Sequence, residues 1–574
     1  MRVKKDYTTE RYQKPDSFRS IIRTNSEKYG SKPLFKFINK DNGIGEVSFV
    51  QFYNDVKSLG TVLFDMGLAG KHIAILSESR PEWVTAYMTA LCTGSVAVPL
   101  DKELVDEQIK NFLDFSEANV LFYSEAFSDK VVEMADLLPN IKHFICFDEI
   151  TAKDDRFRCF SDILDYGEKL LSEGSTFYDK ARVDTSKMCA IIFTSGTTGT
   201  SKGVMLSQDN IISCVHAASN MVDFDEKDVL FSVLPLHHTY ETSCGVLTPI
   251  FIGATVCFNN SLKYFMKNVN LFKPTGMALV PLFITTIYKK IMEEVKKKGK
   301  ERIFKGAVTV TKNLRRVGVD LRKVAFGEVS KALGGNLSKI ISGGAALEPS
   351  LVDRFEEFGI QISEGYGITE CSPLVSVNPF DKYKYGSVGI PIKGSTVKVI
   401  LQGEDDNEAD ADTGEIGEIC IKGPQVMLGY YKNPEATAAA FSQEGFYKSG
   451  DYGYIDEDGY IFITGRKKNI IVLQNGKNIY PEEIEEYLYK LDVISECVVI
   501  GKESDNGEIL LTAIIYPDYT KFEGLDQPAI VEIMKAEVMK INQQLPIFKQ
   551  IRNVELKKTE FEKTTTKKIM RHKI

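Results

Sequence analysis

The sequence predicts an α/β fold, with a large N-terminal part built on parallel sheets and a small α+β part at the C-terminal end. Short apolar runs alternate with helical stretches up to residue 385, strand pairs joined by turns follow, and residues 467–574 combine a helix start with further strand-like runs. The chain has 574 residues, more than one hydrophobic core usually organises, so we expect two or more domains.

The first region has the pattern of successive βαβ units. Short strands separated by helices favour a parallel sheet. The uncharged stretch 242–262 has the length of a membrane span, but Pro249 and Gly253 interrupt it, and a spanning helix needs about 20 mostly apolar residues. We expect a buried helix followed by a core strand there. The strand-like runs are 72–79, 95–100, 119–124, 189–194, 229–235, 254–258 and 276–281.

Beyond residue 385 the strands have the pattern of antiparallel pairs. Turn residues separate alternating strands between 396–401 and 415–423, and again within 452–465, which is typical of hairpins. We expect these strands to form a small β-rich subdomain. It completes an N-terminal domain over residues 1–465.

The last unit begins near Arg466. Pro481 stands at the first position of an expected helix, with acidic residues in its first turn, where they favour helix initiation. Two apolar runs, a second helix and a final strand follow. We therefore predict a compact α+β domain over residues 466–574.

Composition narrows the class of protein. Hydrophobic residues make up 43% and charged residues 26% of the chain, which is ordinary for a globular protein. The net charge of −8 argues against a nucleic-acid partner. Ten cysteines without a CxxC motif indicate free, mostly buried thiols in a reducing compartment. The first 18 residues contain no apolar core typical of a signal peptide, so we expect a cytoplasmic protein.

One segment differs from the acidic average. Residues 289–323 contain 13 Lys or Arg and 4 Asp or Glu, a local charge of +9. The segment is either a solvated helical face or a surface that contacts an anionic membrane, where each basic residue contributes about 1 kcal/mol.

A glycine-rich loop follows the apolar run at 189–194. The stretch FTSGTTGTSKGV at 193–204 combines glycines, hydroxyl side chains and a lysine. Backbone N–H groups of such a loop can surround phosphate oxygens, and hydroxyls and Lys202 add donors and charge. The order of residues is not that of a Walker A loop, and the next helix signal comes only at Ser207. The candidate phosphate ligands are Thr194, Ser195, Gly196, Thr197, Thr198, Gly199 and Lys202.

The loop resembles the phosphate-binding signature of the adenylate-forming superfamily, which includes acyl-CoA synthetases, adenylation domains of peptide synthetases and luciferases. LPLHHTYE at 234–241 and the basic insert that leads to IISGGAALEP at 340–349 look most like bacterial long-chain fatty acid–CoA ligases. Further similar segments are EGYGITE at 364–370, YKSGDYGYID at 447–456, GRKKNIIVLQNGKNIYPEEIE at 465–485 and EKTTTKKIMR at 562–571.

The resemblance implies a reaction in two steps. A fatty acid carboxylate attacks the α-phosphate of ATP, which gives an acyl-adenylate and pyrophosphate, and the thiol of coenzyme A then displaces AMP. ATP, Mg²⁺ and coenzyme A would be required. Two alternatives remain: transfer of the acyl group to a carrier-protein phosphopantetheine, and a catalytically silent relative that only binds nucleotide.

The resemblance also assigns roles at the reacting phosphate. Lys568 aligns with the catalytic lysine and would bridge the incoming carboxylate and the α-phosphate, a position where positive charge stabilises the transition state. The family usually has Gly where Lys567 stands, so the two lysines could exchange roles. Glu370 and the Thr194 hydroxyl would be oxygen ligands of Mg²⁺.

The nucleotide would lie between two glycine-containing segments. Tyr366 offers an aromatic face to adenine, and residues 342–347 would form the opposite wall, because small residues admit a flat base. Asp451 would accept hydrogen bonds from the ribose diol, and Arg466 would serve the ribose or the phosphates. The remaining nucleotide candidates are Gly343, Gly344, Ala345, Glu364, Gly365, Gly367 and Thr369.

Three further roles follow from the resemblance. His238 would lie near the acyl carboxylate, whereas His237 receives no role. Lys468 aligns with a hinge about which the mobile small domain rotates between the two steps. Gly476 would permit close passage of pantetheine, with Lys477 nearby for charge.

The acyl pocket is expected between the helix that starts at 237 and a wall made of 276–288 and 342–347. We expect an apolar lining without a basic residue, which favours an aliphatic or steroid-like acid over a dicarboxylate. Chain length should dominate selectivity, at about 0.8 kcal/mol per buried methylene. The residues expected to line it are Val246, Leu247, Met277, Leu279 and Phe283.

Overall fold

The computed structural model describes residues 10–150, 154–194, 202–402, 408–474, 477–504, 508–564 and 568–574. The chain forms two compact units, and each is described by itself. The first contains residues 1–396 and 422–440, and the second contains residues 397–421 and 441–574. This division differs from the expected domains 1–465 and 466–574, and the domain boundary stays a prediction.

The first sheet of the first unit has the strand order β20-β9-β8-β4-β3-β5-β6-β7. Strands β8, β4, β3, β5, β6 and β7 pair in parallel, and β9 adds antiparallel to β8. The prediction of a parallel sheet is therefore confirmed for its interior. The strands are β3 (His72–Leu76), β4 (Val96–Pro99), β5 (Val120–Tyr123), β6 (His143–Cys146), β7 (Phe157–Cys159), β8 (Met188–Thr194), β9 (Lys202–Ser207) and β20 (Gly429–Tyr430).

The second sheet of the first unit has the order β16-β15-β14-β13-β12-β10-β11-β1-β2. Its centre is parallel, and antiparallel strands close both edges. The strands are β1 (Pro33–Ile38), β2 (Ile44–Ser48), β10 (Val229–Ser232), β11 (Thr255–Phe258), β12 (Gly276–Leu279), β13 (Lys339–Gly343), β14 (Gln361–Gly367), β15 (Leu374–Val377) and β16 (Ile390–Pro391).

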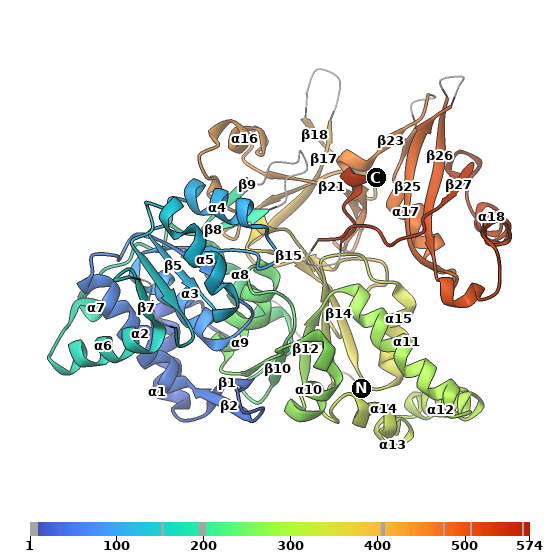
Figure 1. The fold of residues 1–574 in the computed structure, drawn as a ribbon. Coiled ribbons are helices and arrows are strands. Elements are labelled where there is room, and N and C mark those ends of the chain that lie inside the picture. Colours follow the sequence, from blue (N-terminus) through green and yellow to red (C-terminus); the bar gives the residue numbers. More distant parts are fainter. Residues whose placement is uncertain are drawn as a thin grey trace. The chain divides into compact units, whose positions relative to one another are not determined.

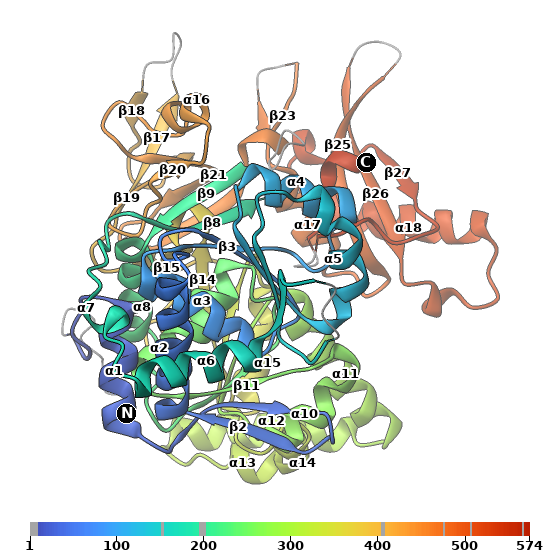
Figure 2. The ribbon, with the colours of Figure 1, turned by 60° about the vertical axis from the view of Figure 1, so that its left-hand side comes forward.

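Amphipathic helices bury this sheet. Ile284, Ile287 and Ile291 recur at helical spacing on α11 (Pro281–Lys297) and are buried in one apolar cluster with strands β10, β12 and β13, as the periodicity requires. Figure 1 shows α10 (Phe265–Phe272), α11 and α15 (Pro349–Glu357) beside strands β12 and β14. Figure 2 shows α1 (Phe18–Tyr29), α2 (Phe49–Asp65), α3 (Pro81–Thr93) and α6 (Phe160–Ser172) gathered on another side of the same unit, where they contact one another.

Local signals in the sequence explain two of these elements. The Ser207 hydroxyl accepts the backbone N–H of Asn210 and starts α8 (Gln208–Met221), as predicted. The uncharged stretch 242–262 contains the end of a π-helix (Tyr240–Leu247), then α9 (Thr248–Ile252) and the core strand β11. Gly253 ends α9 with φ of +82°, a conformation that glycine adopts without strain. The expected buried helix and core strand are confirmed.

The second unit is richer in antiparallel strands. Strands β21 (Tyr447–Ile455) and β22 (Ile461–Arg466) pair antiparallel, which confirms that expected hairpin; β18 (Glu408–Asp410), β17 (Thr396–Gln402) and β19 (Gly417–Lys422) complete their sheet. The C-terminal part contains α17 (Pro481–Leu488), which begins at Pro481 as predicted, and α18 (Gln527–Asn542). A sheet of β25 (Ile494–Glu503), β26 (Ile509–Pro517) and β27 (Asn553–Leu556) packs with them.

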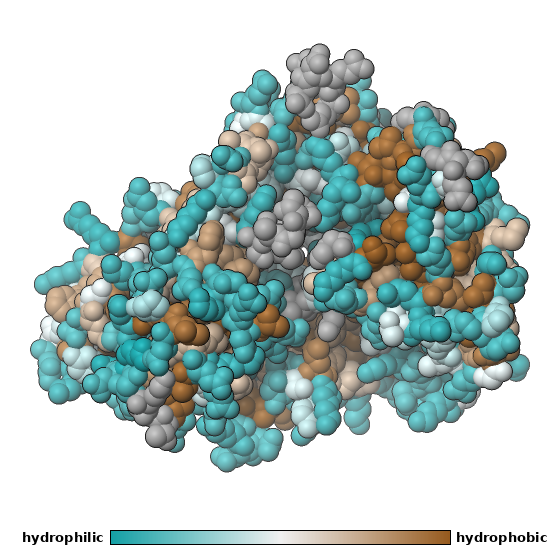
Figure 3. Space-filling view, turned by 45° about the horizontal axis from the view of Figure 1, so that its top comes forward, coloured by the Kyte–Doolittle hydropathy of each residue, from teal (hydrophilic) through white to brown (hydrophobic). Residues whose placement is uncertain are grey.

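The polarity of the surface and the state of the cysteines agree with the amino-acid composition. The face shown in Figure 3 is mostly hydrophilic, with apolar side chains in scattered patches. In the described part of the chain, every helix is too short or too polar to cross a membrane. All ten cysteines are free, and eight of them are buried, which confirms the expected free, mostly buried thiols.

Candidate active site

The glycine-rich loop joins two antiparallel strands. Thr194 ends β8 and pairs with Lys202, the first residue of β9. The loop therefore closes a hairpin, and the helix α8 begins only after β9. Five of the candidate phosphate ligands lie outside the described residues: Ser195, Gly196, Thr197, Thr198 and Gly199.

Lys202 and Glu370 meet through a tyrosine. Strand β20 pairs with β9, and the Lys202 Nζ lies 4.6 Å from the centroid of the Tyr430 ring. The Tyr430 hydroxyl donates to Glu370 Oε1 over 3.0 Å. Sequence analysis missed Tyr430, whose only signal is an aromatic pair just before Asn433 and Pro434. The structure thus brings Lys202 and Glu370 together at the base of the loop.

The donor set at this position fits Mg²⁺. Glu370 follows β14 in a short 3-10 turn (Thr369–Cys371), and the Met427 N–H holds its backbone carbonyl at 2.8 Å. Carboxylate and hydroxyl oxygens from Glu370 and Thr194 are the hard ligands that Mg²⁺ prefers, with water completing its shell. No cluster of three or more His, Cys, Asp or Glu that could hold a metal ion occurs among the described residues.

The two segments expected around the nucleotide are neighbouring strands. Strands β13 and β14 pair in parallel, with Gly343 in register with Gly365. A Cβ at Gly367 would lie 2.3 Å from the Pro373 carbonyl oxygen, so only glycine fits there. Gly344 has φ of +87°, which also favours glycine, and Ala345 beside it is exposed.

The acid at the start of the EGYGITE motif has a structural contact. Glu364 is buried in β14, and the Tyr383 hydroxyl donates to its carboxylate. Tyr366 and Thr369 are half-buried. The main chain of β14 is anchored on β15, where Tyr366 pairs with Ser376.

The two histidine rings contact each other at a tilt of 45° in the turn between β10 and the π-helix. Their ring centroids are 4.1 Å apart. The His237 Nε2 lies 3.5 Å from Asp101 Oδ2, and burial, aided by Lys102, lowers the pKa of His237 to about 3. His237 is therefore neutral at physiological pH. His238 is half-buried, and its carbonyl accepts the N–H of Thr242, which fixes the backbone at the start of the helix.

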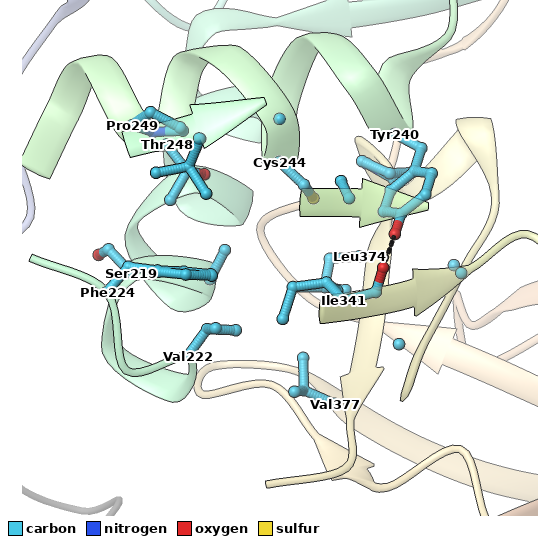
Figure 4. A pocket seen from close by; sticks show the side chains of 18 of the residues that line it. Ser219, Val222, Phe224, Tyr240, Cys244, Thr248, Pro249, Ile341, Leu374 and Val377 are labelled. Carbon is cyan, nitrogen blue, oxygen red and sulfur yellow. Dashed lines mark hydrogen bonds between the residues drawn. The ribbon is translucent and has the colours of Figure 1, made fainter. Parts of the chain in front are cut away.

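A pocket lies within the first unit, between α8, the π-helix, and strands β10, β12, β13 and β14 (Figure 4). Its cavity volume is about 100 Å³, and the open space around it, solvent included, is about 960 Å³. None of the described residues that line it is charged. The lining residues are Ala218, Ser219, Val222, Phe224, Leu230, Phe231, Tyr240, Cys244, Gly245, Thr248, Pro249, Ile252, Met277, Ala278, Ile341, Gly343, Gly344, Gly365, Tyr366, Gly367, Pro373, Leu374 and Val377.

Three hydroxyls in the pocket, those of Tyr240, Ser219 and Thr248, are satisfied by the protein. The Tyr240 hydroxyl donates to the Ile341 carbonyl at 3.0 Å, visible as the dashed line in Figure 4. Ser219 donates to the His216 carbonyl of α8, and Thr248 donates to the Ser243 carbonyl of the π-helix, each at 2.8 Å. Such groups gain little from a polar ligand because their hydrogen bonds are already made. The pocket therefore suits an aliphatic chain.

An uncharged pocket lies where the acyl pocket is expected, but only one of the five residues expected to line it does so. Met277 lines the pocket, whereas Val246, Leu247 and Leu279 are buried elsewhere, and Phe283 packs into the core behind β12. The π-helix and the strand alternation turn these side chains away. Sequence analysis missed Val222, Phe224 and the β15 residues, because the pocket also uses a loop and a strand far apart in sequence.

A second set of candidates meets within the second unit. Asp451 on β21 is buried and pairs with Arg466 on β22, with Arg466 Nε 2.7 Å from Asp451 Oδ1. The Lys568 side chain is exposed. Desolvation and repulsion by Arg466 lower the pKa of Lys568 to about 8, and attraction to Asp451 partly offsets this lowering. The structure thus brings together the three predicted residues Asp451, Arg466 and Lys568.

The hinge and channel candidates lie on the same unit. Lys468 is exposed in a short turn after β22, and desolvation with repulsion from Arg466 and Arg571 lowers its pKa. Lys477 places its Nζ 4.1 Å from the Phe548 ring centroid. Gly476 and Lys567 lie outside the described residues.

Comparison with known proteins identifies the family. Residues 22–431 match the family described as AMP-binding enzyme, and residues 468–574 match the AMP-binding enzyme C-terminal domain. The chain is 30% identical to the long-chain-fatty-acid–CoA ligase FadD15 of Mycobacterium bovis, over 84% of this chain and 79% of that protein. It is 26% identical to the long-chain-fatty-acid–[acyl-carrier-protein] ligase AEE15 of Arabidopsis thaliana, over 90% and 78%.

The fold has solved counterparts. The anthranilate CoA ligase AuaEII in complex with anthranoyl-AMP superposes with a TM-score of 0.77 at 22% identity, over 99% of this chain and 98% of that chain. At this identity the likeness shows the fold. The family match covers most of the chain and agrees with the order of motifs in the sequence. The chain belongs to the AMP-binding enzyme family of adenylate-forming ligases.

Proposed function

We propose that the chain is an AMP-forming fatty acid–CoA ligase. It activates a medium- to long-chain fatty acid with ATP and then forms the coenzyme A thioester, releasing pyrophosphate and AMP. The observation that carries this proposal is the uncharged pocket in the first unit, three of whose hydroxyls are already bonded within the protein. FadD15, the relative at 30% identity, is named as a long-chain fatty acid–CoA ligase.

In the first step, the charged cluster of the second unit acts on the phosphate. The ammonium of Lys568 neutralises charge between the fatty acid carboxylate and the α-phosphate as the new P–O bond forms and the bond to pyrophosphate breaks. Asp451 accepts the ribose hydroxyls, and Arg466 holds the Asp451 carboxylate in place. Glycines 343, 344, 365 and 367 with Tyr366 and Ala345 receive the base, and Glu364 and Thr369 hold the backbone beside it.

The remaining first-step ligands surround the phosphates and the carboxylate. Lys202 and the loop that it ends bind the phosphate oxygens, while Glu370 and Thr194 hold Mg²⁺, which when bound offsets the charge of pyrophosphate. His238 lies beside the acyl carboxylate, at the turn that precedes the pocket helix.

In the second step, the sulfur of coenzyme A forms a C–S bond to the acyl-adenylate carbonyl carbon and its thiol proton passes to solvent, while AMP leaves with the electron pair of the broken C–O bond. The small domain rotates about Lys468 between the steps, which removes Lys568 and brings the segment with Gly476 and Lys477 to the thiol. The hinge needs only a change of backbone angles, so its side chain is not required for chemistry.

A carrier protein is the second candidate for the thiol. The similarity to AEE15, named as an acyl-carrier-protein ligase, favours this alternative to a smaller degree. A catalytically silent nucleotide-binding relative is disfavoured, because it would have no need to retain Lys568, Glu370, Asp451 and Arg466.

The basic segment 289–323 supports peripheral contact with an anionic membrane. Ile303, Val310 and Val317 are spaced by seven residues along and just beyond α12 (Glu301–Arg316), and they are 70%, 57% and 74% exposed. An exposed apolar row flanked by lysines and arginines is suited to the interface of an anionic bilayer. Flotation with anionic and zwitterionic vesicles tests this contact: we expect binding to the anionic vesicles alone, and equal or no binding would contradict it.

The decisive experiment measures AMP release with ATP, Mg²⁺ and coenzyme A across saturated fatty acids from C4 to C18, with coenzyme A omitted as control. Turnover that requires coenzyme A and peaks at one chain length is the expected result. Pyrophosphate exchange without a coenzyme A product would favour a carrier protein. Absence of fatty-acid-dependent exchange at every length would refute the enzyme proposal.

A further inference from the structure

We propose that Phe224, held in place by the N-terminal segment 10–14, closes the far end of the acyl pocket and sets the longest chain that the enzyme accepts. This inference rests on the proposed function, because it concerns the same pocket. It assigns a role to two features that the sequence motifs do not cover: the loop after α8, and the segment that precedes α1.

Phe224 and Tyr240 lie at opposite sides of the pocket in Figure 4. At the Tyr240 side, a Cβ at Gly343 would come within 2.9 Å of the Tyr240 ring, so this end adjoins the glycines assigned to the nucleotide. A carboxylate that reacts with the α-phosphate must lie at that side. The methyl end of the chain then points toward Phe224.

Phe224 lines the pocket, and it also contacts residues that do not line it. Its ring lies over Gly276, where a Cβ would approach it within 2.5 Å, and the Lys339 Nζ is 4.9 Å from its centroid. Phe224 is only 8% exposed. The ring therefore separates the pocket from the protein exterior on this side.

The N-terminal segment holds the Phe224 backbone from outside. The Arg11 guanidinium donates to the Phe224 carbonyl over 3.0 Å, and the Tyr12 hydroxyl contacts the same oxygen at 3.4 Å. Arg11 also pairs with Asp223 and Asp225, at 3.2 and 3.7 Å. The residues on both sides of Phe224 are thus fixed by the same arginine.

The segment is itself anchored on α8. The side-chain oxygen of Asn220 accepts the backbone N–H groups of Arg11 and Tyr12 at 2.6 and 3.0 Å, and the His216 ring bonds the Tyr12 carbonyl at 2.8 Å. The Tyr12 ring packs on the same apolar cluster as Phe224 and Leu230. Residues more than 200 positions apart in sequence therefore build one wall behind the pocket.

The test compares chain-length profiles of wild type, Phe224→Ala and Phe224→Trp, from C8 to C22, by pyrophosphate exchange. We expect Phe224→Ala to move the optimum to longer chains, with kcat/KM rising about fourfold for each methylene newly buried. Phe224→Trp should move the optimum to shorter chains. Short acids that do not reach the ring should react at wild-type rates in all three proteins.

Phe326→Ala is the matched control, because Phe326 is also buried in the first unit but does not line the pocket. It should leave the optimum unchanged. Arg11→Ala should broaden the chain-length profile toward long acids without lowering the rate on short acids. The Phe224 ring remains in this variant, but the contacts that hold its backbone are weakened. Where Phe224→Ala fails to fold, judged by its melting curve, Phe224→Leu and Phe224→Trp provide the same comparison.

Two failures remain distinguishable. If wild type shows no fatty-acid-dependent exchange, the proposed function fails. If wild type is active on fatty acids but the Phe224 variants keep its optimum, or shift it no more than Phe326→Ala does, the far end of the pocket lies elsewhere and this inference is overturned.

Discussion

The apolar pocket of the first unit and the charged cluster of the second unit are built on opposite physical principles. In the pocket, every hydroxyl discussed above is bonded to backbone, so shape and buried area determine what binds. In the cluster, Arg466 neutralises Asp451, while Lys568 carries a charge that its surroundings disfavour. Substitutions in the pocket should therefore change which acid reacts, and substitutions in the cluster should change how fast any acid reacts.

The strongest test of this contrast is Lys568→Ala. Loss of a charge that stabilises the transition state typically costs about 10²–10³-fold in rate, so adenylation should fall by about that factor for every chain length. Thioester formation from supplied acyl-adenylate should persist, because Lys568 is not needed in that step. Pyrophosphate exchange and a coenzyme A assay measure the two steps separately.

Lys573→Ala is the matched control, since Lys573 lies in the same tail but pairs with Glu562. It should retain wild-type adenylation. Equal loss of both steps in Lys568→Ala would contradict the division of labour, and full activity there would move the role to another residue of the tail, with Lys567→Ala as the next variant.

Asp451→Asn should have the next largest effect. The substitution removes the carboxylate that pairs with Arg466 and that we assign to the ribose. A hydrogen bond to a charged group contributes about 1.5–3 kcal/mol, so the KM for ATP should rise about 10- to 100-fold while the preferred chain length stays the same. Initial rates over an ATP series give both values, and Asp456→Asn, in the turn of the same hairpin, serves as control. If Asp451→Asn instead changes the chain-length optimum and keeps the wild-type KM for ATP, the assignment of rate to the cluster and of selectivity to the pocket is contradicted.

The third prediction concerns pH. The pKa of Lys568 is lowered to about 8, so its ammonium is present below pH 8 and is lost as the pH rises through that value. Adenylation should decline above pH 8. Lys568→Arg should abolish this decline at whatever rate it retains, because a guanidinium stays charged. A pH series of pyrophosphate exchange checks this, and an unchanged inflection in the arginine variant would assign the titration to another group.

The sequence contains more information about the charged cluster than about the pocket. Asp451, Arg466 and Lys568 were predicted through the resemblance of short motifs to the adenylate-forming superfamily, because a charge used in chemistry must be a particular residue type at a particular place. The apolar pocket was predicted in position and character, yet only Met277 among its five expected lining residues was right. Many apolar side chains fit a core, and which of them face a cavity depends on strand pleat and helix phase.

The π-helix from Tyr240 to Leu247 illustrates the limit. Its wider turn shifts the phase of the helix, so Tyr240 and Cys244 face the pocket while Val246 and Leu247 turn into the core. An expectation based on a regular helix cannot anticipate this shift. Likewise, the contact of Tyr12 with the Phe224 loop joins segments whose pairing no local pattern indicates.

The smallest expected effect on the reaction itself concerns a carboxyl beside the pocket, whose titration should change stability and leave chain-length preference as it is. Glu241 is fully buried on the π-helix, one of its oxygens accepts the Ser232 hydroxyl, and burial raises its pKa to about 8. The folded protein therefore keeps the proton up to about pH 8, whereas the unfolded chain loses it near the ordinary value for glutamate. Stability falls as the pH rises between these two values, by about 1.4 kcal/mol for each pH unit.

Glu241→Gln removes this dependence, because an amide does not ionise. The melting temperature of the variant relative to wild type should rise from pH 5 to pH 8, by a few degrees for each ~1 kcal/mol, while Glu293→Gln, at an exposed position of α11, should show a constant difference. Chain-length preference should stay as in wild type, because Glu241 does not line the pocket. If the difference in melting temperature is the same at pH 5 and at pH 8, Glu241 ionises in the folded protein. The apolar region beside the pocket would then contain a buried charge, and the contrast between the two units would be lost.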